Sequence, residues 1–222
     1  MNQQTFDSWY TSLKSSIDHN SNYLSFLPQV NSFLYEIIAS PSFTDLPTSF
    51  QQFLYDDYPQ LINKISQSNS LQNQYEDTIK EFYNASLLLS VWAIQNEKFF
   101  LINNISIILN PQNGISHQAQ IYDEVFSFFL ETEIANSIFN NLKNHPDFEN
   151  LKLSLQILSY ILIYCQNKPD KLSIELETFM FTALFDAFDK FFSQLHSDQI
   201  LRTFDDNCLD DIISKLLAVF YY

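Results

Sequence analysis

The scarcity of glycine constrains this chain more than any other feature. Gly114 is the only glycine among 222 residues. Tight hairpin turns, Rossmann domains and phosphate-binding P-loops need positive φ angles or close backbone approach at several positions, and glycine supplies both. The sequence therefore rules out these folds. It favours helices, whose ends proline, asparagine and serine can set instead.

Apolar residues recur at helical spacing along the whole chain. In the first segment they lie on one face of a helix, at Phe6, Trp9, Tyr10, Leu13 and Ile17. The same spacing predicts further helices near 28–38, 48–54, 59–65, 71–92, 99–109, 116–130, 132–143, 147–165, 172–194 and 207–220. Strand signals are nearly absent, so we expect an all-α protein of about ten helices.

Several of these helices have recognisable start signals. Pro28 is placed to begin a regular helix, because the first turn needs no N–H from it. Thr48 and Gln51 have the spacing of a capping box, in which each side chain satisfies a free N–H group. Pro59 predicts the start of another helix, and Ser70 is a suitable N-cap for the one after it.

The segments 87–109, 153–165 and 179–192 are apolar on more than one face. Such helices must be covered on two sides. Stacked antiparallel helix pairs would do this, as in a HEAT-like or armadillo-like α-α superhelix, an α-solenoid. We expect this arrangement over residues 1–222 as a single domain, although no residue-level repeat is visible; a compact orthogonal helical bundle is the alternative.

One stripe in the segment 179–192 is purely aromatic. It runs at three- and four-residue steps through Phe181, Phe185, Phe188 and Phe192. Such a stripe could line a ligand tunnel, but packing in the core is much the commoner use. We expect core packing here.

The chain is strongly acidic, with 26 Asp and Glu against 11 Lys and Arg, a formal charge of -15. Proteins that bind nucleic acid neutralise phosphates with a basic surface, and base contacts rely on arginine. Arg202 is the only arginine. Nucleic acid is therefore excluded as an expected partner.

The C-terminal region holds the candidate partner-binding residues. They are four acidic and three aromatic side chains: Asp205, Asp206, Asp210, Asp211, Phe220, Tyr221 and Tyr222. The acids can steer a basic partner, or they can complement the positive start of the helix predicted at 207–220. The aromatic end can pack back into the core or meet another chain.

Motifs for catalysis are missing. The sequence contains no HExxH, no ExxH pair, no EF-hand loop and no GxSxG, and its two cysteines lie 43 positions apart. We therefore predict no enzyme, no cofactor and no metal. The only loosely motivated catalytic groups are His117 with Asp123 or Glu124, and His196 with Asp198.

The expected location is intracellular, cytoplasmic or nuclear, without membrane insertion. The most apolar window, 153–165, has thirteen residues, whereas a span takes about 20. The N-terminus is polar and lacks the pattern of a signal peptide. The unpaired Cys165 and Cys208 fit a reducing compartment.

Together these features favour a non-catalytic helical scaffold or adaptor that mediates protein–protein interaction, with a basic or amphipathic partner segment. One alternative is an obligate structural subunit of a larger complex, whose apolar faces neighbouring chains cover. Another is an all-α enzyme or small-ligand carrier with a site between helices. The pattern indicates neither the partner's identity nor the oligomeric state.

Overall fold

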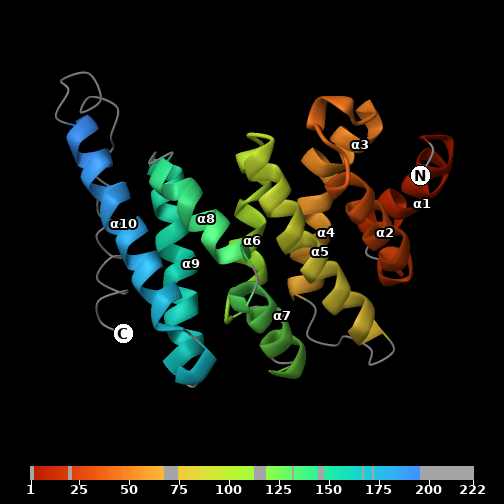
Figure 1. Cartoon of the computed structure of the whole chain (residues 1–222). Helices are drawn as coiled ribbons and strands as arrows, with labels where there is room; N and C mark the ends of the chain where they lie inside the picture. The colour runs from red at the N-terminus through yellow and green to blue at the C-terminus, as the bar shows by residue number, and fades with distance from the viewer. Residues whose placement is uncertain are drawn as a thin grey trace. The chain divides into compact units, whose positions relative to one another are not determined.

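A computed structural model of the chain describes residues 3–19, 22–67, 75–112, 119–131, 133–144, 148–166, 168–171 and 173–195. These residues form α-helices, short 3-10 turns and one π-helical segment, and none of them lies in a strand (Figure 1). The all-α prediction is confirmed. Counted by their bounds, the described α-helices number ten, or nine when α3 and α4, which are continuous, are taken together. The superhelical stacking stays a prediction.

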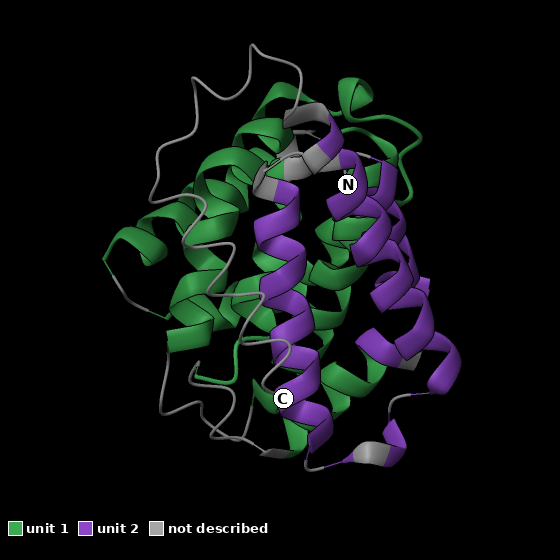
Figure 2. Cartoon of the chain, turned by 90° about the vertical axis from the view of Figure 1, so that its left-hand side faces the viewer, with its two compact units in different colours: residues 1–128 green, residues 129–222 purple. Residues whose placement is uncertain are grey.

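The chain divides into two compact units, residues 1–128 and 129–222 (Figure 2). The single domain expected from the sequence stays a prediction. Unit 1 is built from α1 (Gln3–Asp18), η1 (Tyr23–Phe26), α2 (Leu27–Ile38), η2 (Phe43–Asp45), α3 (Thr48–Gln52), η3 (Phe53–Asp57), α4 (Tyr58–Gln67), α5 (Glu76–Gln95), η5 (Phe99–Leu101), α6 (Asn103–Ile108) and most of α7 (Ala119–Glu131).

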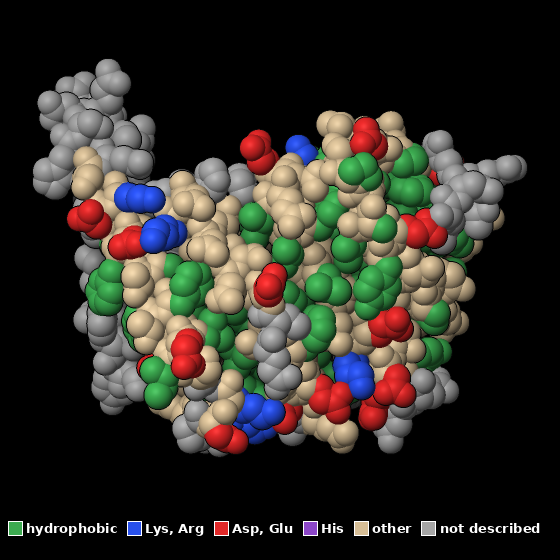
Figure 3. Space-filling model, viewed as in Figure 1, with side chains coloured by type: hydrophobic (Ala, Val, Ile, Leu, Met, Phe, Trp, Pro, Cys, Tyr) green, Lys and Arg blue, Asp and Glu red, His purple; other side chains and the backbone are tan. Residues whose placement is uncertain are grey.

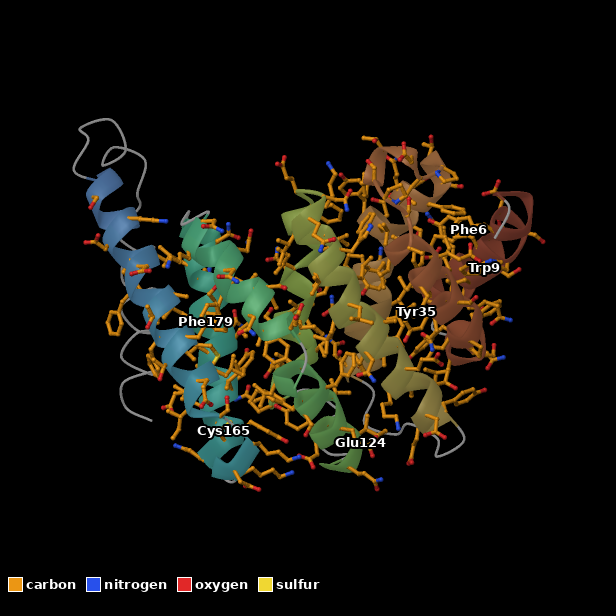
Figure 4. All side chains as sticks on the ribbon, in the orientation of Figure 1. Phe6, Trp9, Tyr35, Glu124, Cys165 and Phe179 are labelled. Atoms are coloured by element: carbon orange, nitrogen blue, oxygen red, sulfur yellow. The ribbon has the colours of Figure 1, made fainter. Side chains whose placement is uncertain are left out.

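An aromatic cluster forms the N-terminal core of unit 1. The ring of Phe6 lies 4.4–6.3 Å, centroid to centroid, from the rings of Tyr10, Phe33, Phe50 and Phe53. All five side chains are buried. The cluster joins α1, α2, α3 and η3, and it confirms the inward face predicted for the first helix. Trp9 packs edge-on against Phe6, with ring centroids 5.0 Å apart; Figure 4 labels the two residues close together at the N-terminal end of the chain.

The helix start predicted at Thr48 is confirmed, but the capping box predicted there and the helix start predicted at Pro59 are wrong. The N-cap of α3 is Pro47, and Thr48 makes no capping bond. Gln51 Nε2 instead donates to the carbonyl of Leu46 at 2.8 Å, because that carbonyl lies within reach just before the helix. No new helix begins at Pro59, since α3, the π-helical η3 and α4 are continuous. The wider π turn suits a proline, which has no N–H for the regular helical bond.

Helix α5 packs mainly against α2. Near their N-terminal ends, Asn31 Nδ2 donates to the Thr78 carbonyl at 3.0 Å, and near their C-terminal ends, Trp92 Nε1 donates to the Ser40 carbonyl at 2.8 Å. These two bonds show that α2 and α5 run parallel. The break between the helices predicted near 71–92 and 99–109 is confirmed, as α5 ends at Gln95. The chain then turns through Glu97, whose φ of 57° is in the left-handed region.

Unit 2 contains the end of α7, α8 (Glu133–Asn144), α9 (Phe148–Gln166), η7 (Pro169–Lys171) and α10 (Ile174–Leu195). Helix α10 packs mainly on α8 and less on α9. At the C-terminal end of α8, Lys143 Nζ lies 2.7 Å from Asp186 Oδ2, and Lys190 Nζ donates to the Lys143 carbonyl at 2.7 Å. Helices α8 and α10 are thus held together near Lys143.

The aromatic stripe of α10 is only partly in the core. Phe188 is buried and Phe181 is half-buried, but Phe185 is 55% exposed, so the core prediction is wrong for Phe185. The buried face of α10 is centred on Met180, Leu184 and Ala187. Phe185 follows Leu184 by about 100° around the helix axis, which places it outside that face. The side chain of Phe192 lies outside the described residues.

Of the helices that the structure describes, none has both the length and the hydropathy needed to cross a bilayer.

Candidate functional site

The candidate partner-binding residues predicted at the C-terminus cannot be placed. Asp205, Asp206, Asp210, Asp211, Phe220, Tyr221 and Tyr222 lie outside the described residues, as do His117, His196 and Asp198. These predictions stay predictions.

Glu124 does have a defined role in unit 1. Its Oε2 lies 2.8 Å from Lys80 Nζ, which ties α7 to α5, and Gln120 Nε2 donates to its Oε1 at 3.3 Å. The hydrogen bond from Lys80 lowers the pKa of Glu124, and the same bond raises the pKa of Lys80. Glu124 is therefore an ionised ion-pair partner on an exposed helix face (Figure 4).

One hollow among the described residues lies in unit 2 and measures about 700 Å³. We call it the α8–α10 groove. One wall comes from α8 and the end of α7, with Leu130, Glu133, Asn136 and Asn140. The other wall comes from η7 and α10, with Lys171, Ser173, Glu175, Leu176 and Phe179. Figure 4 labels Phe179 on α10.

The α8 wall of this groove carries a regular row of polar groups. Glu133, Asn136 and Asn140 follow one another at i, i+3 and i+7, which is one face of a helix, and all three are exposed. Each asparagine amide offers both donors and an acceptor. The facing wall is different, because Leu176 and Phe179 are half-buried and supply apolar surface. The groove therefore combines amides, two acids, one lysine (Lys171) and an apolar strip.

A second hollow, of about 520 Å³, lies in unit 1. We call it the α2–α5 hollow. Five of its lining residues belong to α2, one is the C-cap of α2, and one belongs to α5. In chain order they are Pro28, Asn31, Ser32, Tyr35, Glu36, Ala39 and Glu81. Burial, and then the charge of Glu81, raise the pKa of Tyr35. The phenol and this carboxylate line the same hollow.

A buried carboxylate in unit 1 was not foreseen. Asp57, the last residue of the π segment, is only 2% exposed. The Tyr10 hydroxyl donates to its Oδ2, and Lys14 Nζ lies 3.6 Å from the same oxygen. Burial, followed by the hydrogen bond to Asp57, raises the pKa of Tyr10. Tyr10 therefore stays a protonated donor, and the cluster anchors α1 rather than facing solvent.

The described cysteine is also buried. Cys165 at the end of α9 is 8% exposed. Burial raises the pKa of its thiol to about 11. A thiol of this kind is a poor nucleophile at neutral pH. Among the described residues, no group of three or more His, Cys, Asp or Glu side chains is arranged to hold a metal ion.

Charge on the visible surface is dispersed. On the face that Figure 3 shows, the described acidic side chains are scattered among apolar and uncharged ones rather than gathered in one patch. Surface charge alone therefore marks no binding site on this face, and the two hollows are described by the groups that line them. No protein-family model, curated protein or solved structure matches this chain.

Proposed function

We propose that the chain is a non-catalytic scaffold or adaptor that binds an extended, basic segment of another protein in the α8–α10 groove. One observation carries this proposal: the groove is lined by two exposed amides one helical turn apart, by an apolar strip and by two acids, against a single described cation, Lys171. The groove lies within unit 2, so the proposal needs nothing from unit 1.

The spacing of the amides matches the repeat of an extended chain. Side chains at i and i+4 on a helix are separated by about 5–6 Å. In an extended peptide, groups that face the same way recur every second residue, or about 6.6 Å. Asn136 and Asn140 can therefore each exchange hydrogen bonds with alternate peptide units. Such bonds recognise the main chain and add affinity whatever the ligand sequence.

The other groups of the groove would select side chains. Leu176 and Phe179 offer a surface for one apolar side chain of the ligand. Glu133 and Glu175 favour lysine or arginine next to it, and the net charge of -15 steers a basic segment toward the protein. The favoured ligand is thus an extended segment with basic residues around one apolar residue.

Fluorescence anisotropy with a labelled peptide tests the proposal. The probe is a short peptide in which lysine alternates with serine around one central leucine. We expect saturable binding, and we expect the double variant Asn136→Ala with Asn140→Ala to weaken it at least tenfold, about 1.4 kcal/mol. Both side chains are exposed, so the double variant should fold normally.

The matched control is Asn144→Ala, which removes an exposed amide from the far end of the same helix. It should bind the peptide like the unaltered protein. Equal affinity for the double variant and for Asn144→Ala, with unchanged circular dichroism, would contradict the groove as the binding site. Substitution of both Glu133 and Glu175 by glutamine should mainly slow association and reduce its dependence on salt.

A further inference from the structure

A stripe of side chains on α10 is left uncovered by the other described helices of unit 2. Ile174 and Phe185 are 77% and 55% exposed, the two highest values among the large hydrophobic side chains that the structure describes. Between them, Phe181 is half-buried and Thr178 is exposed. At about 100° per residue, these four side chains lie within about 60° of one another around the helix axis. We call them the outer stripe of α10.

The outer stripe is separate from the surfaces of α10 that already have a role. Helices α8 and α9 lie on one side of α10 (Figure 1), and α10 packs on them with its buried face, centred on Met180, Leu184 and Ala187. The outer stripe is centred about 90° around the axis from Leu184, whereas Leu176 and Phe179 of the α8–α10 groove lie about 80° and 140° the other way. A helix docked on the stripe therefore leaves the groove open.

The sequence after α10 contains an apolar face of the same length. Residues 207–220 lie outside the described residues, and their spacing predicts a helix. Its apolar face would consist of Leu209, Ile212, Ile213, Leu216, Leu217 and Phe220. Leu209 and Phe220 are eleven positions apart, as are Ile174 and Phe185. At 1.5 Å per residue, each face is about 17 Å long, so one can cover the other.

The linking residues are long enough for this segment to return to the stripe. Helix α10 ends at Leu195, which is ten residues, or about 15 Å, beyond Phe185. Residues 196–206 number eleven, and an extended chain of that length reaches about 36 Å. The predicted helix can therefore lie antiparallel to α10, which places Leu209 near Phe185.

The size of the stripe favours the chain's own segment over a separate molecule. A stable interface between two proteins buries about 800 Å² on each side, and three apolar side chains spread over about 17 Å offer far less. A short tether raises the effective concentration of the segment to about the millimolar range, so a small apolar contact suffices. We propose that residues 207–220 form a helix that docks antiparallel on α10 and covers Ile174, Phe181 and Phe185.

Hydrogen–deuterium exchange of the full chain, followed by mass spectrometry, tests this docking. Amides in 207–220 should be protected in the unaltered protein. Phe185→Asp puts a charge into the outer stripe and should speed exchange in 207–220 about tenfold or more, with exchange in α8 and α9 unchanged. The matched control Phe185→Leu keeps the position apolar and should preserve the protection. A lack of protection in the unaltered protein, or its persistence in Phe185→Asp, would overturn the proposal.

Disulfide trapping tests the direction of docking and whether it occurs within one chain. In a Cys208→Ser background that keeps the buried Cys165, one variant carries Phe185→Cys with Leu209→Cys, and its control carries Ile174→Cys with Leu209→Cys. Antiparallel docking brings the first pair together and separates the second by about 17 Å. A disulfide within one chain should therefore form about tenfold faster, or more, in the first variant. Equal rates would contradict antiparallel docking, and disulfides only between chains would assign the stripe to a second copy; either result overturns the proposal.

Discussion

The substitution Tyr10→Phe tests whether the buried carboxylate of Asp57 depends on α1. It removes one oxygen and leaves the ring, which stacks on Phe6 at 5.0 Å and meets Phe53 edge-on at 5.7 Å. The apolar packing of α1 should therefore persist. What changes is that Asp57, at 2% exposure, loses the hydroxyl that donates to it.

The expected cost follows from the kind of bond that is lost. A hydrogen bond to a charged group contributes about 1.5–3 kcal/mol, and the acceptor that remains is buried. Lys14 stays 3.6 Å from Asp57 Oδ2, but its side chain is 43% exposed, so solvent screens its compensation. We expect Tyr10→Phe to lower the free energy of unfolding of unit 1 by about 2 kcal/mol.

Urea unfolding followed by tryptophan fluorescence measures this cost. The chain has two tryptophans, Trp9 and Trp92, and both belong to unit 1, so the signal reports on that unit. The control is Tyr55→Phe, which removes a hydroxyl from a side chain that is 49% exposed. It should change the free energy of unfolding by less than about 0.5 kcal/mol.

A double-mutant cycle with Asp57→Asn completes the test. If the Tyr10 hydroxyl acts through the carboxylate, the two substitutions together should cost clearly less than the sum of their separate costs. The reasoning is refuted if Tyr10→Phe is as mild as Tyr55→Phe, or if the two effects simply add.

Three further outcomes are expected. Phe6→Ala should destabilise unit 1 by about 3–5 kcal/mol in the same unfolding assay, because a fully buried ring leaves a cavity; a loss under about 1 kcal/mol would mean that the cluster collapses to fill it. Trp92→Phe should cost about 1 kcal/mol, measured by circular dichroism, since the bond from Nε1 to the Ser40 carbonyl is lost; no loss would indicate that water replaces the indole donor. In a Cys208→Ser background, Cys165 should react with a thiol reagent only slowly at pH 8, and faster as the pH approaches its pKa of about 11. Because burial raises this pKa, the contribution of the protonated thiol to the stability of the fold is complete below pH 9.0, the pKa of the thiol in the unfolded chain, and is lost as the pH rises to about 11. Rapid labelling of the folded protein at pH 8 would contradict the burial of Cys165.

Much of the helical layout was predictable because helical periodicity is local. The spacing of Phe6, Tyr10 and Leu13 shows their shared face without any knowledge of what covers it. The same holds for α8 and α9, whose bounds lie within two residues of the predicted ones. The capping bonds at helix starts were harder to predict, because several backbone groups compete for the same side chain. Gln51 matched a capping box, but the carbonyl of Leu46 was the nearer partner.

The two hollows were not predictable, because long-range pairing creates them. Nothing in the sequence indicates that Asn31 of α2 meets Thr78 of α5, or that Asn136 of α8 and Phe179 of α10 line the same groove. Asp57 is a similar case. Its neighbour Asp56 is exposed, whereas Asp57 shares a buried helix face with Phe53 and Leu61 at helical spacing. The spacing indicates that face, but nothing in the sequence indicates that the Tyr10 hydroxyl meets the carboxylate there.

The positive φ angles of unit 1 have a consequence for how this protein could be improved. Asn22 and Glu97 adopt φ values of 40° and 57°, in the left-handed region. Asparagine tolerates this region, whereas glutamate is strained there. A chain with one glycine in 222 residues therefore places an unsuitable side chain at position 97. Glu97 in particular follows α5, where glycine is the usual residue. A library selected for heat resistance should therefore recover glycine at position 97 among its first gains.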